Sequence, residues 1–216
     1  MPAVTRREHL LDAARDIAVA DGFPALTIER VAAQADVSRT LIYQQFGDLA
    51  GLITALLDRE SMTAMAGMNS VDRPQSGQGN DLAQVGRDIV NYLHAAPTSW
   101  RLILSPHAGA FPELRDRIEL GRSYARSVAA RHIARTVGHR VAPDSITIRT
   151  LLAAMEELGR LHLNDPQRYP DTLVLQHFQS LATWATDELA RHPRTTRPRA
   201  RRTCQQNRWQ PAGENG

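Results

Sequence analysis

Residues 27–46 read TIERVAAQADVSRTLIYQQF, and this stretch predicts two short helices joined by a tight turn. Thr27 and Ser38 are each placed to cap a helix, because a hydroxyl accepts a hydrogen bond from a backbone N–H two or three residues on. Asp36 falls at the turn between them, where glycine is the easiest residue and where Asp tolerates a left-handed conformation better than most. We therefore expect a helix-turn-helix unit here.

The second helix of this unit is expected to turn Val37 and Ile42 inward and a polar face outward. Gln pairs bidentately with adenine and Arg with guanine, and the Thr methyl and Leu meet the thymine methyl. Tyr and capping hydroxyls commonly hold phosphates. A plain helical hairpin with a solvated face is the alternative. The candidate DNA-contact residues are Thr27, Ser38, Arg39, Thr40, Leu41, Tyr43, Gln44 and Gln45.

The sequence on both sides of this unit resembles the N-terminal domain of TetR-family transcriptional regulators over roughly the first sixty residues. An apolar helix precedes the unit, Asp21-Gly22-Phe23 ends that helix, and Tyr43-x-x-Phe46 leads into a further apolar helix. The resemblance implies an all-α protein with a three-helix helix-turn-helix DNA-binding domain at 1–48. It also implies a helical effector-binding and dimerisation domain at 49–191. Leu49 departs from the family, which usually places a phosphate-binding Lys or Arg there.

The charge of the expected DNA-binding domain is unusual, since such domains are normally basic. Residues 1–51 carry five Arg and seven acidic residues. Residues 192–216 hold six Arg and one Glu and so carry a net charge of +5. Because the net charge of the whole chain is +3, residues 1–191 carry −2. We expect this Arg-, Pro- and Thr-rich tail to be a disordered extension. The alternative is that it adds sequence-independent phosphate contacts.

Composition and motifs argue against several other classes of protein. The single cysteine, Cys204, excludes a disulfide framework and Cys-based zinc sites within one chain. No secretory signal and no bilayer-spanning run is visible, so we expect a cytoplasmic protein. The chain has no P-loop, dinucleotide fingerprint or G-x-S-x-G motif, and we expect no enzymatic activity and no cofactor. His94, His107 and His162 can converge only in three dimensions, and no metal site is expected.

Hydrophobic periodicity and capping residues predict the remaining helices. We expect a loop rich in Gly, Ser, Pro and Gln at 69–80. The helices are expected at about 5–21, 49–68, 82–96, 100–104, 111–137, 146–163 and 172–191.

The last two of these helices are candidates for a dimer interface. Intramolecular core packing is the alternative explanation of their apolar stripes. The resemblance favours the dimer, because regulators of this family typically pair their last two helices into a four-helix bundle. Such a dimer places its reading helices one DNA turn apart, roughly 34 Å, which suits a palindromic operator. The candidate interface residues are Leu151, Leu158, Val174, Phe178, Leu181, Trp184 and Ala185.

The middle helices are expected to hold a small-molecule effector, since an apolar pocket with a few polar groups is the usual form of such a site. The candidate lining residues are His94, Trp100, Leu104, His107, Phe111, Tyr124, Met155, Glu156 and His162. Core packing is the alternative for each. The predicted function is a homodimeric repressor released by a small hydrophobic effector. The alternatives are an activator with the same sites, and an all-helical small-molecule-binding protein or enzyme without DNA binding.

Overall fold

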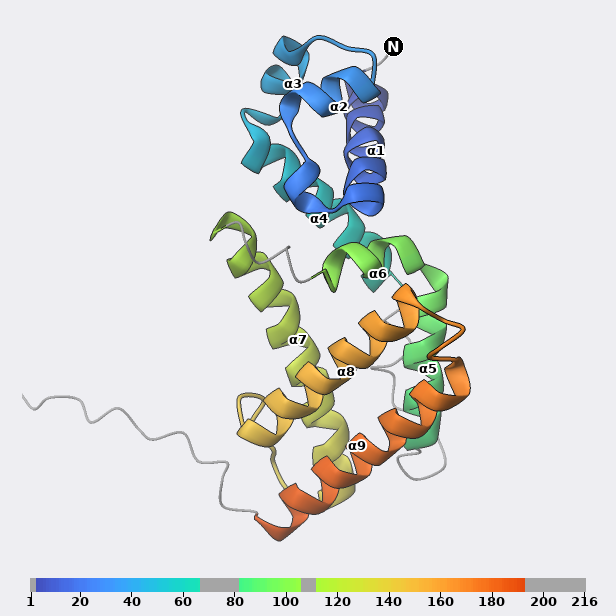
Figure 1. Cartoon of the computed structure of the whole chain (residues 1–216). Helices are drawn as coiled ribbons and strands as arrows, with labels where there is room; N and C mark the ends of the chain where they lie inside the picture. Colours follow the sequence, from blue (N-terminus) through green and yellow to red (C-terminus); the bar gives the residue numbers. More distant parts are fainter. Residues whose placement is uncertain (1–2, 67–81, 106–111, 193–216) are drawn as a thin grey trace, which may run out of the picture.

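The computed structural model describes residues 3–66, 82–105 and 112–192, and Figure 1 shows that these residues are built from helices. The described ranges contain no strand, which confirms the all-α fold class. The first helices are α1 (Ala3–Asp21), a short 3-10 helix η1 (Phe23–Ala25), α2 (Ile28–Gln34), α3 (Arg39–Phe46) and α4 (Leu49–Met65). They are followed by α5 (Leu82–Ala95), α6 (Pro97–Ile103), α7 (Pro112–Val137), α8 (Ile146–Asn164) and α9 (Asp171–Arg191).

The caps that begin α2 and α3 are those that the sequence predicts. The Thr27 hydroxyl accepts a hydrogen bond from the Arg30 N–H at 3.1 Å. The Ser38 hydroxyl accepts one from the Leu41 N–H at 3.4 Å. Each bond satisfies one of the N–H groups that a helix leaves without a partner in its first turn. Both helices of the helix-turn-helix unit therefore begin at the predicted residues.

The turn between α2 and α3 has the left-handed conformation expected at Asp36, whose φ is 52°. The Val37 N–H donates to the Ala32 carbonyl at 3.0 Å, and the Asp36 N–H donates to the Ala33 carbonyl at 3.4 Å. These paired bonds form a Schellman motif, which ends a helix through one left-handed residue. The motif fixes the angle at which α3 leaves α2.

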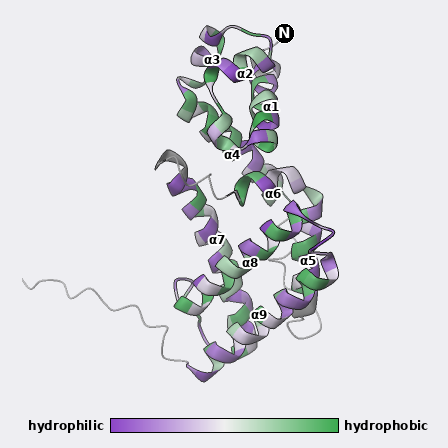
Figure 2. Cartoon of the chain, in the orientation of Figure 1, coloured by the Kyte–Doolittle hydropathy of each residue, from purple (hydrophilic) through white to green (hydrophobic). Residues whose placement is uncertain are grey.

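Helices α1 to α4 share one apolar core, and we call α1 to α3 (residues 3–46) the head. Ile42 of α3 and Leu52, Ile53 and Leu56 of α4 are completely buried in it. Val37 is only partly buried and packs against this core. Figure 2 shows the hydrophobic residues of α4 where the helix meets the head. The core also includes Leu102 of α6, so it reaches beyond the head.

Helices α5 to α9, which we call the body, contain two further apolar clusters. One joins α7, α8 and α9 around Ile148 and Ala185, and the other joins α5 and α9 around Val90 and Phe178. Gly159 of α8 lets α6 approach closely, since a Cβ there would lie 3.3 Å from the Leu104 side chain. The buried apolar residues thus form three clusters. Helices α4 and α6 lie between the head and the other helices of the body (Figure 1).

Two helix boundaries differ from expectation. The helix predicted at 100–104 begins instead at Pro97. Proline is tolerated in the first turn of a helix because the N–H that it lacks would have no partner there. The helix predicted at 49–68 ends at Met65. The predicted loop at 69–80 and the tail at 193–216 lie outside the described residues.

The strain at Asp36 generates a stability prediction. A left-handed residue with a Cβ costs roughly 1–2 kcal/mol, and glycine avoids that cost. We expect Asp36→Gly to exceed Asp36→Ala by about 1 kcal/mol in free energy of unfolding, measured by urea denaturation, with the wild type between them. Equal stability of the Gly and Ala variants would contradict a left-handed residue at this position.

Candidate DNA-binding surface

The outer face of α3 carries the polar side chains that the sequence assigned to DNA. Ser38, Arg39, Thr40, Tyr43 and Gln44 are exposed, and Tyr43 exposes 50% of its surface. Leu41 and Gln45 are partly buried at the edges of this face, and Thr27 is exposed at the start of α2. The opposite side of α3 is anchored by Ile42, which is completely buried. Seven of the eight candidate residues therefore lie at the surface or at its edge in or next to α3, and Thr27 lies at the start of α2.

Arg39, the main cation of this face, is paired with an acidic residue of α2. Its Nη1 lies 3.3 Å from Oε1 of Glu29, and both side chains are 64% exposed. A hydrogen bond from its own backbone and a second from Arg39 hold the pKa of Glu29 below its usual range, so this carboxylate stays ionised at neutral pH. This pair was not predicted from the sequence. A negative charge consequently lies beside the residues proposed to meet phosphates.

Three other acidic residues of the head, Glu8, Asp12 and Asp21, pair with arginines that lie outside α3. Arg59 of α4 lies 3.1 Å from a Glu8 carboxylate oxygen and 3.0 Å from one of Asp12. Arg30 pairs with Asp21. These ion pairs engage three carboxylates of α1, whereas Asp36 and Asp48, on either side of α3, are exposed.

Arg7 has a structural role within the head. Its Nη1 donates to the Gln45 carbonyl at 2.8 Å, and its guanidinium lies 4.4 Å from the centre of the Phe46 ring. The first contact satisfies a carbonyl at the end of α3, and the second is a cation–π contact. Arg7 thus holds α3 against α1, and these two contacts occupy part of its guanidinium.

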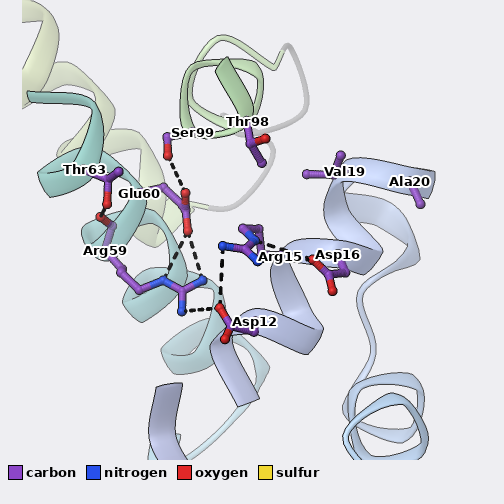
Figure 3. A pocket seen from close by; sticks show the side chains of 10 residues that line it. All are labelled: Asp12, Arg15, Asp16, Val19, Ala20, Arg59, Glu60, Thr63, Thr98 and Ser99. Carbon is purple, nitrogen blue, oxygen red and sulfur yellow. Dashed lines mark hydrogen bonds and ion pairs between the residues drawn. The ribbon is translucent and has the colours of Figure 1, made fainter. Parts of the chain in front are cut away.

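A polar network joins the head to the body through α4, and Figure 3 shows it from close by. Glu60 is 3% exposed, accepts a hydrogen bond from the Ser99 hydroxyl at 2.6 Å and pairs with Arg59 at 3.0 Å. Burial opposes the charge of Arg59, but its hydrogen bonds to Glu8 and Glu60 outweigh burial and raise the pKa of Arg59. These contacts link α1, α4 and α6 along one edge of a polar cavity of about 650 Å³.

Two of the predicted effector residues meet at a second cavity, of about 490 Å³, in the body. The Nε2 atoms of His94 and His162 are 3.0 Å apart, and their rings stack with centroids 5.2 Å apart. Asp171, which is not among the residues predicted from the sequence, lies against both rings. The cavity is lined by His94, Pro97, Arg101, His162, Leu163, Pro166, Pro170, Asp171 and Thr172.

The other predicted effector residues lie elsewhere. Trp100 donates its indole N–H to the Tyr92 carbonyl at 3.0 Å, and Leu104 faces Gly159. Met155 packs against both clusters of the body. Glu156 accepts three hydrogen bonds from Arg122, at 3.0, 3.1 and 2.9 Å, which raise the pKa of that guanidinium. Tyr124 is 39% exposed on α7. His107 and Phe111 lie outside the described residues.

Most of the predicted interface residues on α8 and α9 are packed inside the chain itself. Each of Leu151, Val174, Phe178 and Ala185 is at most 3% exposed within the clusters of the body. Leu158 and Leu181 are partly buried against the same clusters. The alternative of intramolecular packing therefore describes these positions, and Trp184, 40% exposed, is the predicted residue that stays at the surface.

In the part of the chain that the structure describes, no helix is long and apolar enough to cross a membrane.

Residues 10–56 match the family described as bacterial regulatory proteins, tetR family. YvkB of Bacillus subtilis, named as an HTH-type transcriptional regulator, is 22% identical over 185 residues, covering 81% of this chain and 93% of YvkB. FasR of Mycolicibacterium smegmatis, named as an HTH-type transcriptional activator, is 22% identical over 165 residues, covering 76% of this chain and 75% of FasR.

Solved structures share the fold. A transcriptional regulator from Rhodococcus sp. Rha1 aligns with a TM-score of 0.66 at 17% identity, over 84% of this chain and 96% of the other. The multidrug binding protein EbrR, solved with imidazole, aligns with a TM-score of 0.60 at 20% identity, over 82% of this chain and 89% of EbrR. The geometry and the matches together define a helix-turn-helix DNA-binding regulator. The N-terminal domain is that of the TetR family of transcriptional regulators, and the fold of the chain agrees with it.

The Glu29–Arg39 pair generates a prediction for DNA affinity. Glu29→Gln removes a charge that repels phosphates and frees Arg39, so we expect tighter binding to the DNA upstream of the chain's own gene. The gain should be several-fold at low salt and should shrink as salt increases, because screening weakens electrostatic contacts. Fluorescence anisotropy across a salt series measures both effects.

The matched control is Glu157→Gln in α8. Glu157 is also exposed, its pKa is also lowered by an arginine partner, Arg160, and it lies in the body. It should leave DNA affinity unchanged. An equal gain in both variants would mean that only net charge matters, and Glu29 would then have no special position at the DNA.

Proposed function

We propose that this chain is a homodimeric repressor that binds a palindromic operator near its own gene and is released by a small hydrophobic effector. The observation that carries the proposal is the exposed polar face of α3, with Arg39, Tyr43 and Gln44 exposed on a helix that the completely buried Ile42 anchors to the core. Its side chains match the chemistry of base edges and phosphates. We assign DNA binding to residues 1–48 and effector binding and dimerisation to 49–191, followed by a basic tail at 192–216.

Pairing of two chains is supported by apolar side chains left exposed on the outer faces of α8 and α9. Leu173 and Trp184 of α9 are 36% and 40% exposed, and Ile146 at the start of α8 is 79% exposed. Ala153 of α8 is exposed and small enough for another helix to approach. We therefore assign the interface to these outward residues, with Trp184 at its centre. A symmetric pair would hold two heads at the fixed spacing that a palindromic operator requires.

Effector binding is supported by the cavity beside His94 and His162, whose walls combine prolines and Leu163 with a few polar side chains. A relative of the same fold, EbrR, is named as a multidrug binding protein. The cavity includes Pro97 and Arg101 of α6, and α6 contacts α4 through the Ser99–Glu60 hydrogen bond. An effector that favours a different position of α6 would act on the heads through α4. The shift it produces is limited by the difference in its affinity for the two conformations.

Two other functions use the same residues. An activator role is supported by the name of FasR, and it differs from repression only in where the operator lies relative to the promoter. A helical binding protein or enzyme without DNA contacts is supported by Leu49, which stands where the family usually has a phosphate-binding cation, and by Glu29 beside Arg39. A reporter fused to the chain's own promoter distinguishes repression from activation.

DNA binding is tested by gel retardation of the chain's own upstream region at low salt. We expect Arg39→Ala and Tyr43→Ala each to weaken binding by roughly 5- to 150-fold, the equivalent of 1–3 kcal/mol for a good contact. Arg149→Ala and Tyr124→Ala replace exposed residues of the same types in the body and should retain wild-type binding. If the wild-type protein does not retard this DNA at all, the proposal that it regulates by binding its own upstream region is wrong.

The interface assignment predicts that Trp184→Glu produces monomers. A charge at the centre of a symmetric contact is desolvated next to its own copy, which opposes association. Light scattering after size exclusion measures the mass, and operator affinity should fall at least tenfold because the two heads are no longer held together. Leu120→Glu, a similar change at a 73% exposed residue of α7, should remain dimeric. A dimeric Trp184→Glu protein would place the interface elsewhere.

A further inference from the structure

Three side chains with metal-binding atoms converge from three helices of the body. His94 lies at the end of α5, His162 near the end of α8, and Asp171 is the first residue of α9. Their ligand atoms all lie within 4.8 Å of one another. The two Nε2 atoms are 3.0 Å apart, and the Asp171 Oδ1 atom is 3.2 Å from that of His94 and 3.4 Å from that of His162.

These separations match the edges of a small coordination tetrahedron. Zinc bonds imidazole nitrogen and carboxylate oxygen at about 2.0–2.2 Å, so two ligand atoms of a tetrahedral site lie roughly 3.3 Å apart. All three measured separations fall within a few tenths of an ångström of that value. An ion could therefore bond the three atoms at ordinary lengths without any helix moving.

The environment of His162 prepares its Nε2 atom to be a ligand. The residue is 3% exposed, and its Nδ1 atom lies 2.8 Å from the Tyr169 carbonyl oxygen. A carbonyl only accepts, so Nδ1 carries the proton and, in the neutral ring, Nε2 presents its lone pair toward His94 and Asp171. Metal-binding histidines are usually oriented by such a hydrogen bond from the other ring nitrogen. The Tyr169 carbonyl fills that supporting role here.

We propose that His94, His162 and Asp171 form a binding site for a divalent first-row transition metal ion, with Zn²⁺ the best fit. Two imidazoles and one carboxylate suit zinc, cobalt and nickel, whereas magnesium and calcium prefer sites built from oxygen alone. Three protein ligands leave a fourth position, and all three residues line the same cavity as Pro97 and Pro166. Water or a donor atom of a small molecule completes the coordination there.

Metal binding would fasten three helix ends together beside α6. Arg101 of α6 donates two hydrogen bonds, at 2.9 and 2.7 Å, to the carbonyl oxygen of Leu163, which follows His162 in the sequence. The ion would thus stabilise the end of α8, to which α6 is hydrogen-bonded. Because a ligand that binds only the folded state raises its stability, the melting temperature should rise with metal concentration. The site itself does not depend on the proposal that the chain represses transcription.

The test is competition for Zn²⁺ between the full chain, stripped with a chelator, and a chromophoric zinc indicator. We expect one zinc ion per chain, no effect of Mg²⁺, and a visible Co²⁺ absorption band of the intensity typical of four-coordinate cobalt. His94→Gln and Asp171→Asn should each weaken zinc binding at least about 100-fold, since even supporting residues commonly contribute 10- to 100-fold. His162→Gln should do the same.

His94 and Asp171 are about half exposed, so their variants should fold even if a change at buried His162 disturbs the core, and circular dichroism checks this. His177→Gln replaces an exposed histidine of α9 outside the cluster and should bind zinc like the wild type. Cys204→Ser should also bind normally. Failure of the wild type to compete for zinc would overturn the site, as would wild-type affinity in His94→Gln or loss of binding in Cys204→Ser.

Discussion

The structure depends on a single helix, α4, that is buried against both the head and the body. Its first half contributes Leu52, Ile53 and Leu56 to the core of the head. Its second half carries Glu60, a carboxylate almost fully removed from water. A buried charge is tolerated only when its partners are in place, and here Arg59 and Ser99 provide them. A change in the angle of α4 would therefore require either a rearrangement of this network or a movement of α1 and α6 with it.

This constraint gives the charges of the head a structural explanation. A net negative DNA-binding domain is unexpected from composition alone, but Glu8 and Asp12 bind Arg59, which in turn pairs with Glu60. Their negative charges support the connection to α4, so they are not free to repel DNA from α3. Glu29 is different, because its partner is Arg39 itself. Several acidic residues of the head are thus engaged on α1, whereas Glu29 lies beside Arg39 and Asp36 lies in the turn that precedes α3.

The sequence predicted the local features well, because caps and turns depend on residues a few positions apart. Thr27, Asp36 and Ser38 each behave in the structure as their chemistry predicts. Most helices also begin and end within a few residues of expectation. Periodicity likewise identified buried stripes on α8 and α9, but it cannot tell which surface covers a stripe. Val174 and Phe178 face α5 of the same chain, a contact that joins segments far apart in the sequence.

The cluster of His94, His162 and Asp171 shows the same limit more sharply. No spacing motif connects residues from three helices, and Asp171 was recognisable only as an acid at the start of α9. It comes into position because His162 is held by the Tyr169 carbonyl in the connection between α8 and α9, two residues before Asp171. The bond that orients the imidazole thus also orders the connection that delivers the carboxylate.

Whatever occupies this site binds α5, α8 and α9 at once, next to the helix whose Ser99 stabilises the buried charge of α4. A ligand bound here and DNA bound at α3 would influence each other through that contact, through the Arg117–Asp58 ion pair between α7 and α4, and through the neighbouring apolar packing. The strength of coupling is then set by how differently α6 and α7 rest on α4 in the two conformations.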